Sequence, residues 1–237
     1  MTEKKAILTK GNAKDVFTTE NSENIVLHFK DTATAYHNIK KATITGKGVL
    51  TNKISAILFK KLNEAGIESH FVSLLNDREQ LCKKLTIIPI RVITRNIASG
   101  SIVHRLGIDD GTIFQSAVYE YNYKKEELDN PFINEHHIVA LGLATYNEIA
   151  QINNITTKIN GLLSDIFHSI GIALVDFKLE FGRTADGTIL LADEISPDTC
   201  RLWDESTKKR LDKDRFRRDM GDIIDAYNEI YSRLEKL

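Results

Sequence analysis

The segment 175–181 alternates apolar and ionisable side chains without a break, and this alternation constrains the fold more than any other feature of the chain. Successive side chains of a β-strand point to opposite faces, so Asp176, Lys178 and Glu180 share one face while their apolar neighbours share the other. Such a strand needs a hydrophobic core on one side and an environment for charges on the other. The pattern therefore predicts a strand at the border between the core and a polar site.

A turn signal follows this strand. The dipeptide Asp186-Gly187 strongly favours a hairpin, and a two-residue loop at this position places Glu180 directly opposite Asp193 on the returning strand. Two opposed carboxylates repel each other, so we expect a cation between them. Mg²⁺ held by one or two carboxylates, phosphates and water fits this pair, with Lys178 as an additional cation. The alternative is a solvent-exposed hairpin whose charges are simply hydrated, although the apolar strand ends favour a central hairpin.

The remaining segments predict an α+β fold. The first half contains short β-type segments and one helix at about 52–64, where apolar residues recur at helical spacing before Gly66. In the second half, Thr145 and Glu148 have the spacing of a capping box at the start of a long helix. After this helix we expect two strands, 172–181 and 188–195, and a last helix, 214–234.

This order of elements predicts two lobes that abut without a flexible linker. We expect a smaller, β-rich N-terminal lobe, residues 1–88, and a larger α/β C-terminal lobe, residues 89–237. The cleft between two lobes is a usual position for a ligand.

Charge and cysteine content exclude several partners. Lys and Arg number 32 against 33 Asp and Glu, and the net charge of −1 provides no general attraction to nucleic acid or an anionic membrane. No stretch approaches about 18 apolar residues, and segment 1–15 lacks the apolar region of a secretory signal, so we expect neither a membrane span nor secretion. Cys82 and Cys200 have no CxxC spacing, which favours a cytoplasmic protein without disulfides or a zinc cluster. Any anion must therefore be bound by local groups.

Three segments could bind an anion locally. Between two short strands, Gly11 lets the backbone approach a phosphate and Lys14 can neutralise it. Arg95 precedes a short helix that begins near Ser101, where N–H groups and hydroxyls could hold a phosphate, although a simple helix start is the commoner interpretation. The two lysines at 83–84 could equally form a hydrated edge.

The region after residue 192 contains two further polar segments. Segment 193–204 includes Arg201 and a Ser-Pro-Asp sequence, which predicts a loop. In segment 212–219 arginines alternate with aspartates, which predicts a solvated helix face rather than a nucleic-acid surface. The histidines show no metal-binding spacing, and neither cysteine has a histidine placed to activate it.

Taken together, these segments closely resemble the phosphoribosylaminoimidazole-succinocarboxamide synthase (SAICAR synthetase) family over nearly the whole chain. The chain departs from the commonest family pattern at Asn12, where Lys is frequent, and at Asn130, where a second Asp is common. The segments that carry the resemblance are GNAK (11–14), GKGVLTNKIS (46–55), KKL (83–85), TRNIASGS (94–101), YNYK (121–124), INEHH (133–137), VDFKLEFG (175–182), DEISPDTCRLWD (193–204) and DKDRFRRD (212–219).

The resemblance implies an ATP-dependent carbon–nitrogen ligase of de novo purine biosynthesis. Such an enzyme joins L-aspartate to the carboxylate of carboxyaminoimidazole ribonucleotide, 5-amino-1-(5-phospho-D-ribosyl)imidazole-4-carboxylate, and releases SAICAR, ADP and phosphate. The implied fold is related to ATP-grasp and kinase-like architectures, with ATP bound by the N-terminal lobe and the substrate and Mg²⁺ site on the C-terminal lobe. A cytoplasmic homodimer is implied as well.

Individual residues receive roles from the same resemblance. Lys178 and Asp176 would be catalytic and would face the reacting carboxylate and the incoming aspartate. Glu180 and Asp193 would hold Mg²⁺, in agreement with the expected hairpin pairing. The residues implied at the nucleotide are Gly11, Ala13, Lys14, Lys83, Leu85, Ile87, Lys124, Glu180 and Asp193. Those implied at the ribonucleotide are Arg95, Ser101, Asp176, Lys178 and Arg201.

Two other functions are compatible with these residues. A small-molecule kinase would use the same lysine and the same Mg²⁺ carboxylates, although the HRD and DFG motifs of protein kinases are absent. A catalytically inert regulator would bind ATP without turnover. An assay with and without aspartate separates the three alternatives.

Overall fold

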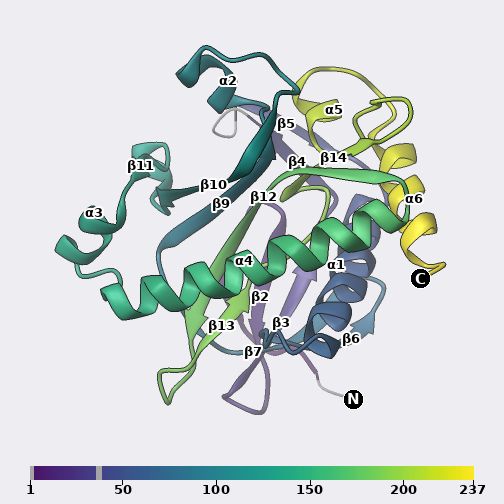
Figure 1. Cartoon of the computed structure of the whole chain (residues 1–237). Helices are drawn as coiled ribbons and strands as arrows, with labels where there is room; N and C mark the ends of the chain where they lie inside the picture. Colours follow the sequence, from purple (N-terminus) through teal and green to yellow (C-terminus); the bar gives the residue numbers. More distant parts are fainter. Residues whose placement is uncertain (1–2, 36–38) are drawn as a thin grey trace.

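The computed structural model describes residues 3–35 and 39–237, which form two large β-sheets packed with helices (Figure 1). The first sheet is antiparallel throughout. In spatial order its strands are β1 (Ile7–Lys10), β2 (Lys14–Thr18), β3 (Asn24–Phe29), β7 (Glu79–Lys83) and β6 (Phe71–Asn76). These short strands confirm the predicted β-rich first half.

The second sheet is organised around β12 (Ile172–Arg183). Strand β14 pairs with the first half of β12, β9 pairs with its middle, and β13 and β8 pair with its last residues. The main path of this sheet is β11 (Phe132–Ile133), β10 (Ile113–Tyr123), β9 (Ile90–Ile97), β12 and β13 (Ile189–Ala192), while β14 (Cys200–Asp204) and β8 (Thr86–Ile87) also pair with β12. β12 has neighbours on both edges, and nine of its twelve residues are buried.

The helices and one small hairpin complete the fold. Strands β4 (Thr32–Ala35) and β5 (Lys40–Thr43) form the hairpin. The helices are α1 (Lys47–Glu64), α2 (Ser101–Leu106), the 3-10 helix η1 (Glu126–Leu128), α3 (Glu135–Ala140), α4 (Tyr146–Ser169), α5 (Asp214–Arg217) and α6 (Ile223–Leu234). Together the sheets and helices confirm the predicted α+β class.

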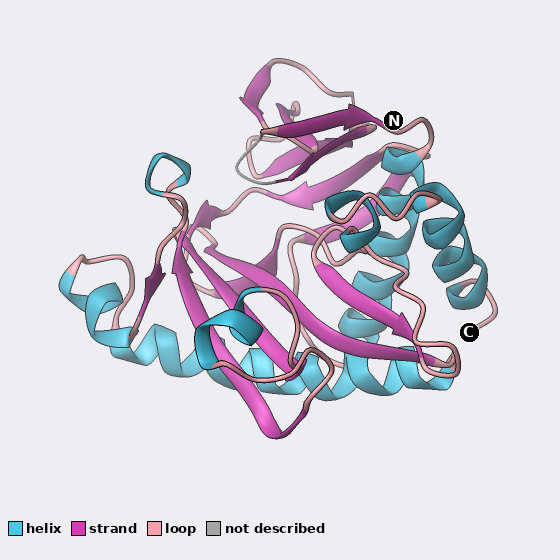
Figure 2. Ribbon diagram, turned by 90° about the horizontal axis from the view of Figure 1, so that it is seen from above, coloured by secondary structure: helices cyan, strands magenta, loops and turns pink. Residues whose placement is uncertain are grey.

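Helix α4 covers one face of the second sheet and forms a layer of its own (Figure 2). The predicted capping box is present: the amide of Glu148 donates to Thr145 Oγ1 at 3.2 Å, and the amide of Thr145 donates to Glu148 Oε2 at 2.7 Å. Ile152, Ile159 and Leu163 are fully buried in the main core. Each such side chain contributes about 1.5–3 kcal/mol by leaving water, so the apolar stripe fixes α4 on the sheet.

The two faces of β12 differ as predicted. Phe177 and Leu179 lie in the main core at 1% exposure. On the opposite face, Asp176 and Glu180 are also buried, at 5% and 4% exposure. The alternative of a hydrated surface hairpin is therefore wrong, because these carboxylates face a polar interior.

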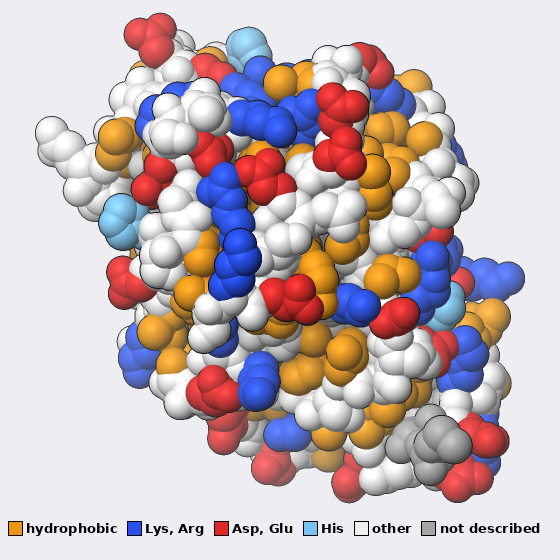
Figure 3. Space-filling view, turned by 90° about the vertical axis from the view of Figure 1, so that its right-hand side faces the viewer, with side chains coloured by type: hydrophobic (Ala, Val, Ile, Leu, Met, Phe, Trp, Pro, Cys, Tyr) orange, Lys and Arg blue, Asp and Glu red, His pale blue; other side chains and the backbone are white. Residues whose placement is uncertain are grey.

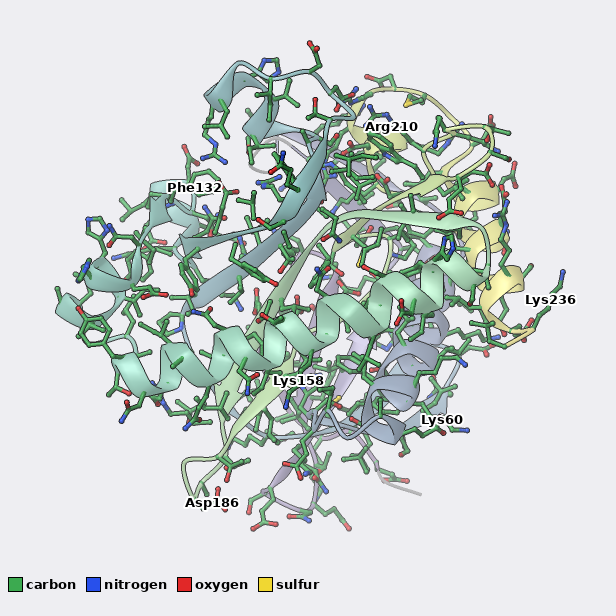
Figure 4. All side chains as sticks on the ribbon, viewed as in Figure 1. Lys60, Phe132, Lys158, Asp186, Arg210 and Lys236 are labelled. Atoms are coloured by element: carbon green, nitrogen blue, oxygen red, sulfur yellow. The ribbon has the colours of Figure 1, made fainter. Side chains whose placement is uncertain are left out.

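The expected register of the β12–β13 hairpin is wrong by one residue. Glu180 pairs with Ala192, and Asp193 lies beyond the end of β13. The loop has three residues instead of two, since the amide of Thr184 donates to the carbonyl of Thr188. Asp186, labelled at the hairpin tip in Figure 4, keeps a negative φ because its carboxylate accepts the Thr188 amide, so only Gly187 adopts a positive φ. A two-residue type I′ turn would need positive φ at both central positions.

Three expectations for the C-terminal region are also wrong. The last helix is interrupted between α5 and α6, where Asp219, Gly221 and Asp222 have positive φ and cannot continue a right-handed helix. Part of the expected loop 193–204 forms strand β14. Asp214 is 1% exposed, so segment 212–219 is not a solvated face.

The division into lobes at residue 88 agrees with the sheets only in part. The strands of the first sheet lie within 7–83, and those of the second within 86–204. Helix α1, however, places Ile54 and Leu58 in the main core with the second sheet, so the exact boundary stays a prediction. Among the described residues, no helix is long and apolar enough to cross a bilayer. Figure 3 shows charges of both signs interspersed on one face, in keeping with the net charge of −1.

Candidate active site

Asp176 lies between two arginines on neighbouring strands. In the register of the sheet, Arg95 on β9 and Arg201 on β14 stand directly opposite Asp176 on β12. Arg95 Nη1 donates to Asp176 Oδ2 at 3.1 Å, and Arg201 Nη1 donates to the same oxygen at 2.6 Å. The Asp176 side chain is 7% exposed, and a carboxylate buried this deeply requires such partners. The strands thus place positive, negative and positive side chains in a row across the sheet.

The other contacts of Arg95 fix its position. Its Nε donates to Glu120 Oε2 at 2.7 Å, its Nη1 to the carbonyl of Ser99 at 3.3 Å, and its Nη2 to Ser101 Oγ at 3.5 Å. The structure therefore brings together Arg95 and Ser101, both predicted at the ribonucleotide. Gly100 between them has φ +69°, and a Cβ there would lie 2.7 Å from Arg201 Nη2, so only glycine fits this close approach.

Asp214 extends the same network and was not predicted. Its carboxylate accepts hydrogen bonds from Arg201 Nε at 3.0 Å, Arg210 Nη1 at 3.2 Å and Arg217 Nη1 at 2.6 Å. Burial raises the pKa of Asp214, but Arg201 and Arg217 outweigh burial and lower this pKa to about 2. Charge alternation alone did not distinguish this buried network from a solvated helix.

Glu180, at the other end of the polar face of β12, is held by two cations. Lys124 Nζ donates to Glu180 Oε2, and Arg91 Nε donates to Oε1 at 3.2 Å. The Glu180 side chain is 6% exposed, whereas Lys124 is 34% exposed. Arg91 was missed by the sequence analysis, although it lies four residues before Arg95 in one strand and therefore on the same face.

Lys14 connects the first sheet to the acidic segment after β13. Its Nζ lies 2.5 Å from Asp193 Oδ1 and 3.1 Å from Glu194 Oε1. Burial alone would lower the pKa of Lys14, but Asp193 and Glu194 outweigh burial and raise it above its usual value. In the preceding loop, the Gly11 amide donates to the carbonyl of Lys14 at 2.9 Å, and Lys30 donates an amide hydrogen bond to the carbonyl of Ala13 at 2.8 Å.

Asp193 adopts a left-handed backbone conformation, with φ +65°. The ring of His70 contacts its carbonyl oxygen, with 3.0 Å between His70 Nε2 and Asp193 O. Burial is the largest effect on His70 and lowers its pKa to about 4, so the ring is neutral at pH 7. Burial alone would raise the pKa of Asp193, but Lys14 and Lys178 outweigh it and keep this pKa well below its usual value.

Lys178 lies among the acidic groups without an ion-pair partner. Within the described part of the chain, no hydrogen bond or ion pair reaches its ammonium group. Burial and Arg91 lower the pKa of Lys178, while Asp193 and Glu180 oppose this shift. A partly buried cation without a fixed partner is available to an anionic substrate.

Lys83, Leu85 and Ile87 lie where the chain passes from the first sheet to the second. Lys83 belongs to β7 and Ile87 to β8. No hydrogen bond links the Leu85 amide to any residue that the structure describes. Leu85 packs against Gly182, where an added Cβ would lie 2.7 Å from Leu85 Cβ.

A buried pair behind the acidic segment was also missed. Lys47 Nζ, at the start of α1, lies 2.5 Å from Asp198 Oδ2, and Tyr227 Oη donates to Asp198 Oδ1 at 2.7 Å. The charged side chains of this pair are 1% and 3% exposed. Nearby, burial lowers the pKa of Lys213 to about 8 although Asp198 opposes this shift. These contacts hold segment 193–199 between α1 and α6.

The carboxylates of the site form no complete metal-binding cluster. Within residues 3–35 and 39–237, no group of three or more His, Cys, Asp or Glu side chains is arranged to hold an ion. Glu180 and Asp193 supply hard oxygen atoms, each engaged by a lysine. Mg²⁺ typically uses one or two carboxylates and takes its other ligands from phosphates and water. The donor set therefore fits Mg²⁺ only in company with a phosphate ligand.

A polar strand face lined by lysines and arginines is typical of an enzyme that acts on anionic substrates. The chain belongs to the SAICAR synthetase family, whose sequence profile matches residues 7–234. It is 53% identical over 234 residues, 99% of this chain and 100% of the relative, to phosphoribosylaminoimidazole-succinocarboxamide synthase of Clostridium botulinum. The corresponding protein of Fusobacterium nucleatum is 52% identical, with 98% of each chain covered.

Solved structures agree with this assignment. The crystal structure of phosphoribosylaminoimidazole-succinocarboxamide synthase from Ehrlichia chaffeensis superposes with a TM-score of 0.96 at 49% identity, covering 98% of this chain and 99% of that one. A SAICAR synthetase in complex with ADP gives a TM-score of 0.94 at 44% identity, with 97% of each chain covered. The comparisons confirm the predicted family, the fold and the function as an ATP-dependent ligase of purine biosynthesis.

Proposed function

We propose that this protein joins L-aspartate to the carboxylate of carboxyaminoimidazole ribonucleotide and converts ATP to ADP and phosphate. The observation that carries this proposal is the polar face of β12. It presents a preformed arginine network at Asp176, an unpaired ammonium at Lys178 and lysine-bound carboxylates around Glu180. One strand thus offers adjacent sites for a ribonucleotide phosphate, a reacting carboxylate and a nucleotide.

The nucleotide phosphates would bind at Lys14 and Lys124, beside the loop that contains Gly11 and Ala13. Both lysines are engaged by carboxylates of the site. A phosphate can replace a carboxylate as the partner of a lysine, and the released carboxylate can then bind a cation. The ADP complex of a relative supports a nucleotide site in this fold.

The adenine edge would meet the backbone of Lys83, Leu85 and Ile87. The unpaired Leu85 amide offers a donor, and the neighbouring carbonyls offer acceptors. Because main-chain groups in this connection are held by the two sheets, they form a rigid edge for a planar base.

Glu180 and Asp193 would hold Mg²⁺ together with the nucleotide phosphates. When bound, the ion supplies positive charge that offsets the charge of the transferring phosphoryl group. The same two carboxylates form ion pairs with three partly exposed cationic side chains, Lys14, Lys124 and Arg91.

The ribonucleotide phosphate would bind at Arg95, Ser101 and Arg201. Guanidinium groups present several donors in a plane, so Arg201 can contact a phosphate while it keeps its hydrogen bonds to Asp176 and Asp214. Both arginines contact Asp176 Oδ2, and within the described residues nothing donates to Oδ1. Asp176 Oδ1 is therefore available to a substrate N–H.

The reaction would proceed in two balanced steps. First, a substrate carboxylate oxygen attacks the γ-phosphorus of ATP, and ADP leaves with the electron pair of the broken P–O bond. Second, the neutral aspartate amine attacks the acyl carbon, phosphate leaves, and the amine loses a proton. Lys14 and Lys178 would stabilise the negative charge of both steps by electrostatic preorganisation. Asp176 would orient the substrate and, by its position, is the candidate acceptor for the proton.

One assay tests the proposed function. Purified protein receives ATP, Mg²⁺ and the carboxyaminoimidazole ribonucleotide, with and without L-aspartate, and ADP and product are measured. The ligase forms the succinocarboxamide only when aspartate is present. A small-molecule kinase would form product without aspartate, and an inert regulator would bind ATP without releasing ADP.

Isotope transfer tests the acyl phosphate. With ¹⁸O in the substrate carboxylate, the two-step route places one labelled oxygen in the released phosphate. If labelled oxygen never reaches phosphate, the first step is wrong.

A cytoplasmic homodimer is proposed on the family resemblance. The two cysteines are free and buried, which suits a reducing compartment. Light scattering at several protein concentrations measures the mass in solution, and a monomer mass at every concentration would contradict the dimer.

A further inference from the structure

His70 lies at the junction of the two sheets and has no role in the reaction described above. It is 3% exposed, and its ring packs edge-on against Phe59 with 5.4 Å between ring centroids. The adjacent residue Ser69 forms a parallel bridge to Leu191 of β13. His70 therefore belongs to the short segment that joins the first sheet to β13.

Three hydrogen bonds connect His70 to strand β13, to Lys83 and to Asp193. Its amide donates to the carbonyl of Leu191 at 2.8 Å, and its carbonyl accepts the amide of Lys83 at 2.7 Å. Its ring Nε2 lies 3.0 Å from the carbonyl oxygen of Asp193. A carbonyl oxygen can only accept, so this contact requires the proton on Nε2. One residue thus links the proposed adenine edge at Lys83 to the proposed Mg²⁺ ligand Asp193.

The backbone of Asp193 needs such a partner. A non-glycine residue at φ +65° occupies a sparsely populated conformation that persists only when its surroundings hold it. The ring of His70 holds the carbonyl of Asp193, and Lys14 holds its carboxylate. If a nucleotide phosphate replaces Asp193 as the partner of Lys14, as in the proposed function, the contact between His70 and the Asp193 carbonyl would remain.

We propose that His70 is a positioning residue, which fixes the left-handed turn at Asp193 so that its carboxylate is aimed at Mg²⁺ and the nucleotide. This inference rests on the proposed role of Asp193. His70 itself touches neither substrate nor metal, and its effect passes through the Asp193 backbone.

Steady-state kinetics of His70→Phe test this proposal. Phenylalanine keeps the ring and its packing on Phe59 but cannot donate to Asp193. We expect the Mg²⁺ concentration for half-maximal activity to rise about 10-fold or more, as for a lost buried hydrogen bond, while KM for the ribonucleotide changes less than about 2-fold. His70→Gln, whose amide N–H can replace Nε2–H, should recover a substantial part of the Mg²⁺ response.

Ser69→Ala is the matched control. Ser69 is equally buried and donates to Asn63 Oδ1 at 2.8 Å, but it does not contact Asp193. A merely structural role for this segment would make Ser69→Ala and His70→Phe change the Mg²⁺ response alike, and that result would overturn the proposal.

Asp193→Asn separates this inference from the proposed function. If Asp193→Asn weakens the Mg²⁺ response and His70→Phe does not, the positioning role is wrong and the metal assignment stands. If Asp193→Asn leaves the Mg²⁺ response unchanged, both are wrong.

A measurement on the unaltered protein covers the case in which His70→Phe does not fold. In ¹⁵N-histidine spectra, with the His70 signal assigned through its contacts to Phe59, we expect the neutral Nε2–H tautomer. The Nδ1–H tautomer would contradict the hydrogen bond to Asp193 and with it the proposal.

Discussion

The two ends of the polar face of β12 hold their charges in different ways. At the Asp176 end, arginines make several hydrogen bonds each, and Arg95 is 3% exposed. At the Glu180 end, which we call the lysine end, Lys124 contacts Glu180 through a single ammonium group and is 34% exposed, while Arg91 adds one hydrogen bond to the same carboxylate. Lys14 contacts Asp193 and Glu194 across the junction of two sheets.

This difference indicates two modes of binding. A guanidinium with several fixed partners is already in position for a phosphate, whereas an ammonium on a flexible stem can exchange one anion for another. We infer that the arginine end is preformed for the ribonucleotide and that the lysine end rearranges when Mg²⁺ and ATP bind. The predictions below probe the two ends in turn, followed by a distant control.

The largest effect is expected at the lysine end. Glu180→Gln or Asp193→Asn should lower kcat about 10³-fold while the fold survives, because one proposed ligand of the Mg²⁺ that offsets the charge of the phosphoryl group is lost. Turnover and circular dichroism check this result, with the exposed Glu64→Gln on α1 as the control. Near-normal rates in both variants would refute the metal assignment.

At the arginine end the main effect should be on stability. Asp176→Asn removes the anion between the buried guanidinium of Arg95 and the partly buried guanidinium of Arg201, and should lower the free energy of unfolding by about 3 kcal/mol. Denaturant unfolding measures this change, and Asp186→Asn at the exposed hairpin tip should change it by less than about 0.5 kcal/mol. Equal stabilities of Asp176→Asn and the unaltered protein would show that the arginine end is not preformed.

Acid should weaken the arginine end over a defined pH range. The pKa of Asp214 is about 2 in the folded protein against a usual 3.8, so its ionisation stabilises the fold above pH 4 and this contribution is lost as the pH falls toward 2. The shift corresponds to about 2 kcal/mol. Denaturant unfolding at several pH values from 5 to 2 measures the free energy of unfolding. This free energy should fall less steeply with pH in Asp214→Asn than in the unaltered protein, and an equally steep fall would argue against the network.

The smallest effect is expected far from both ends. Glu148→Ala removes half of the capping box of α4 and the contact to Arg183, and should cost about 1 kcal/mol of stability with unchanged kcat. Thermal unfolding measures the loss of stability, and the aspartate-dependent assay measures kcat. A loss of turnover would show that the start of α4 also contributes to the active site.

The alternation in β12 made its two faces predictable, whereas the hairpin register was not. Asp-Gly is compatible with a two-residue and a three-residue loop, and the choice depends on whether the Asp186 carboxylate binds the Thr188 amide. A shift of one residue moved Asp193 out of the strand. Asp193 nevertheless lies at the candidate site because its carboxylate contacts Lys14, and no local sequence pattern predicts a contact between residues so far apart in the chain.

The arginine end shows a second limit of sequence reasoning. Arg95 and Arg201 were expected from motifs, but their placement opposite Asp176 depends on pairing between strands distant in the chain. His70 and Asp214 gave no local signal because their functions arise from contacts with residues far away in sequence or from burial. Motifs therefore indicated which residues belong to the candidate site, their roles stay predictions, and tertiary packing determined how their charges are paired.

Calorimetric titration of two variants with two ligands tests the central claim most directly. ATP with Mg²⁺ and the ribonucleotide are each titrated into Asp193→Asn and Arg201→Lys. We predict that Asp193→Asn weakens binding of ATP with Mg²⁺ and leaves the ribonucleotide nearly unchanged, and that Arg201→Lys does the reverse. If both variants weaken the binding of the same ligand, the two ends of β12 do not form separate sites.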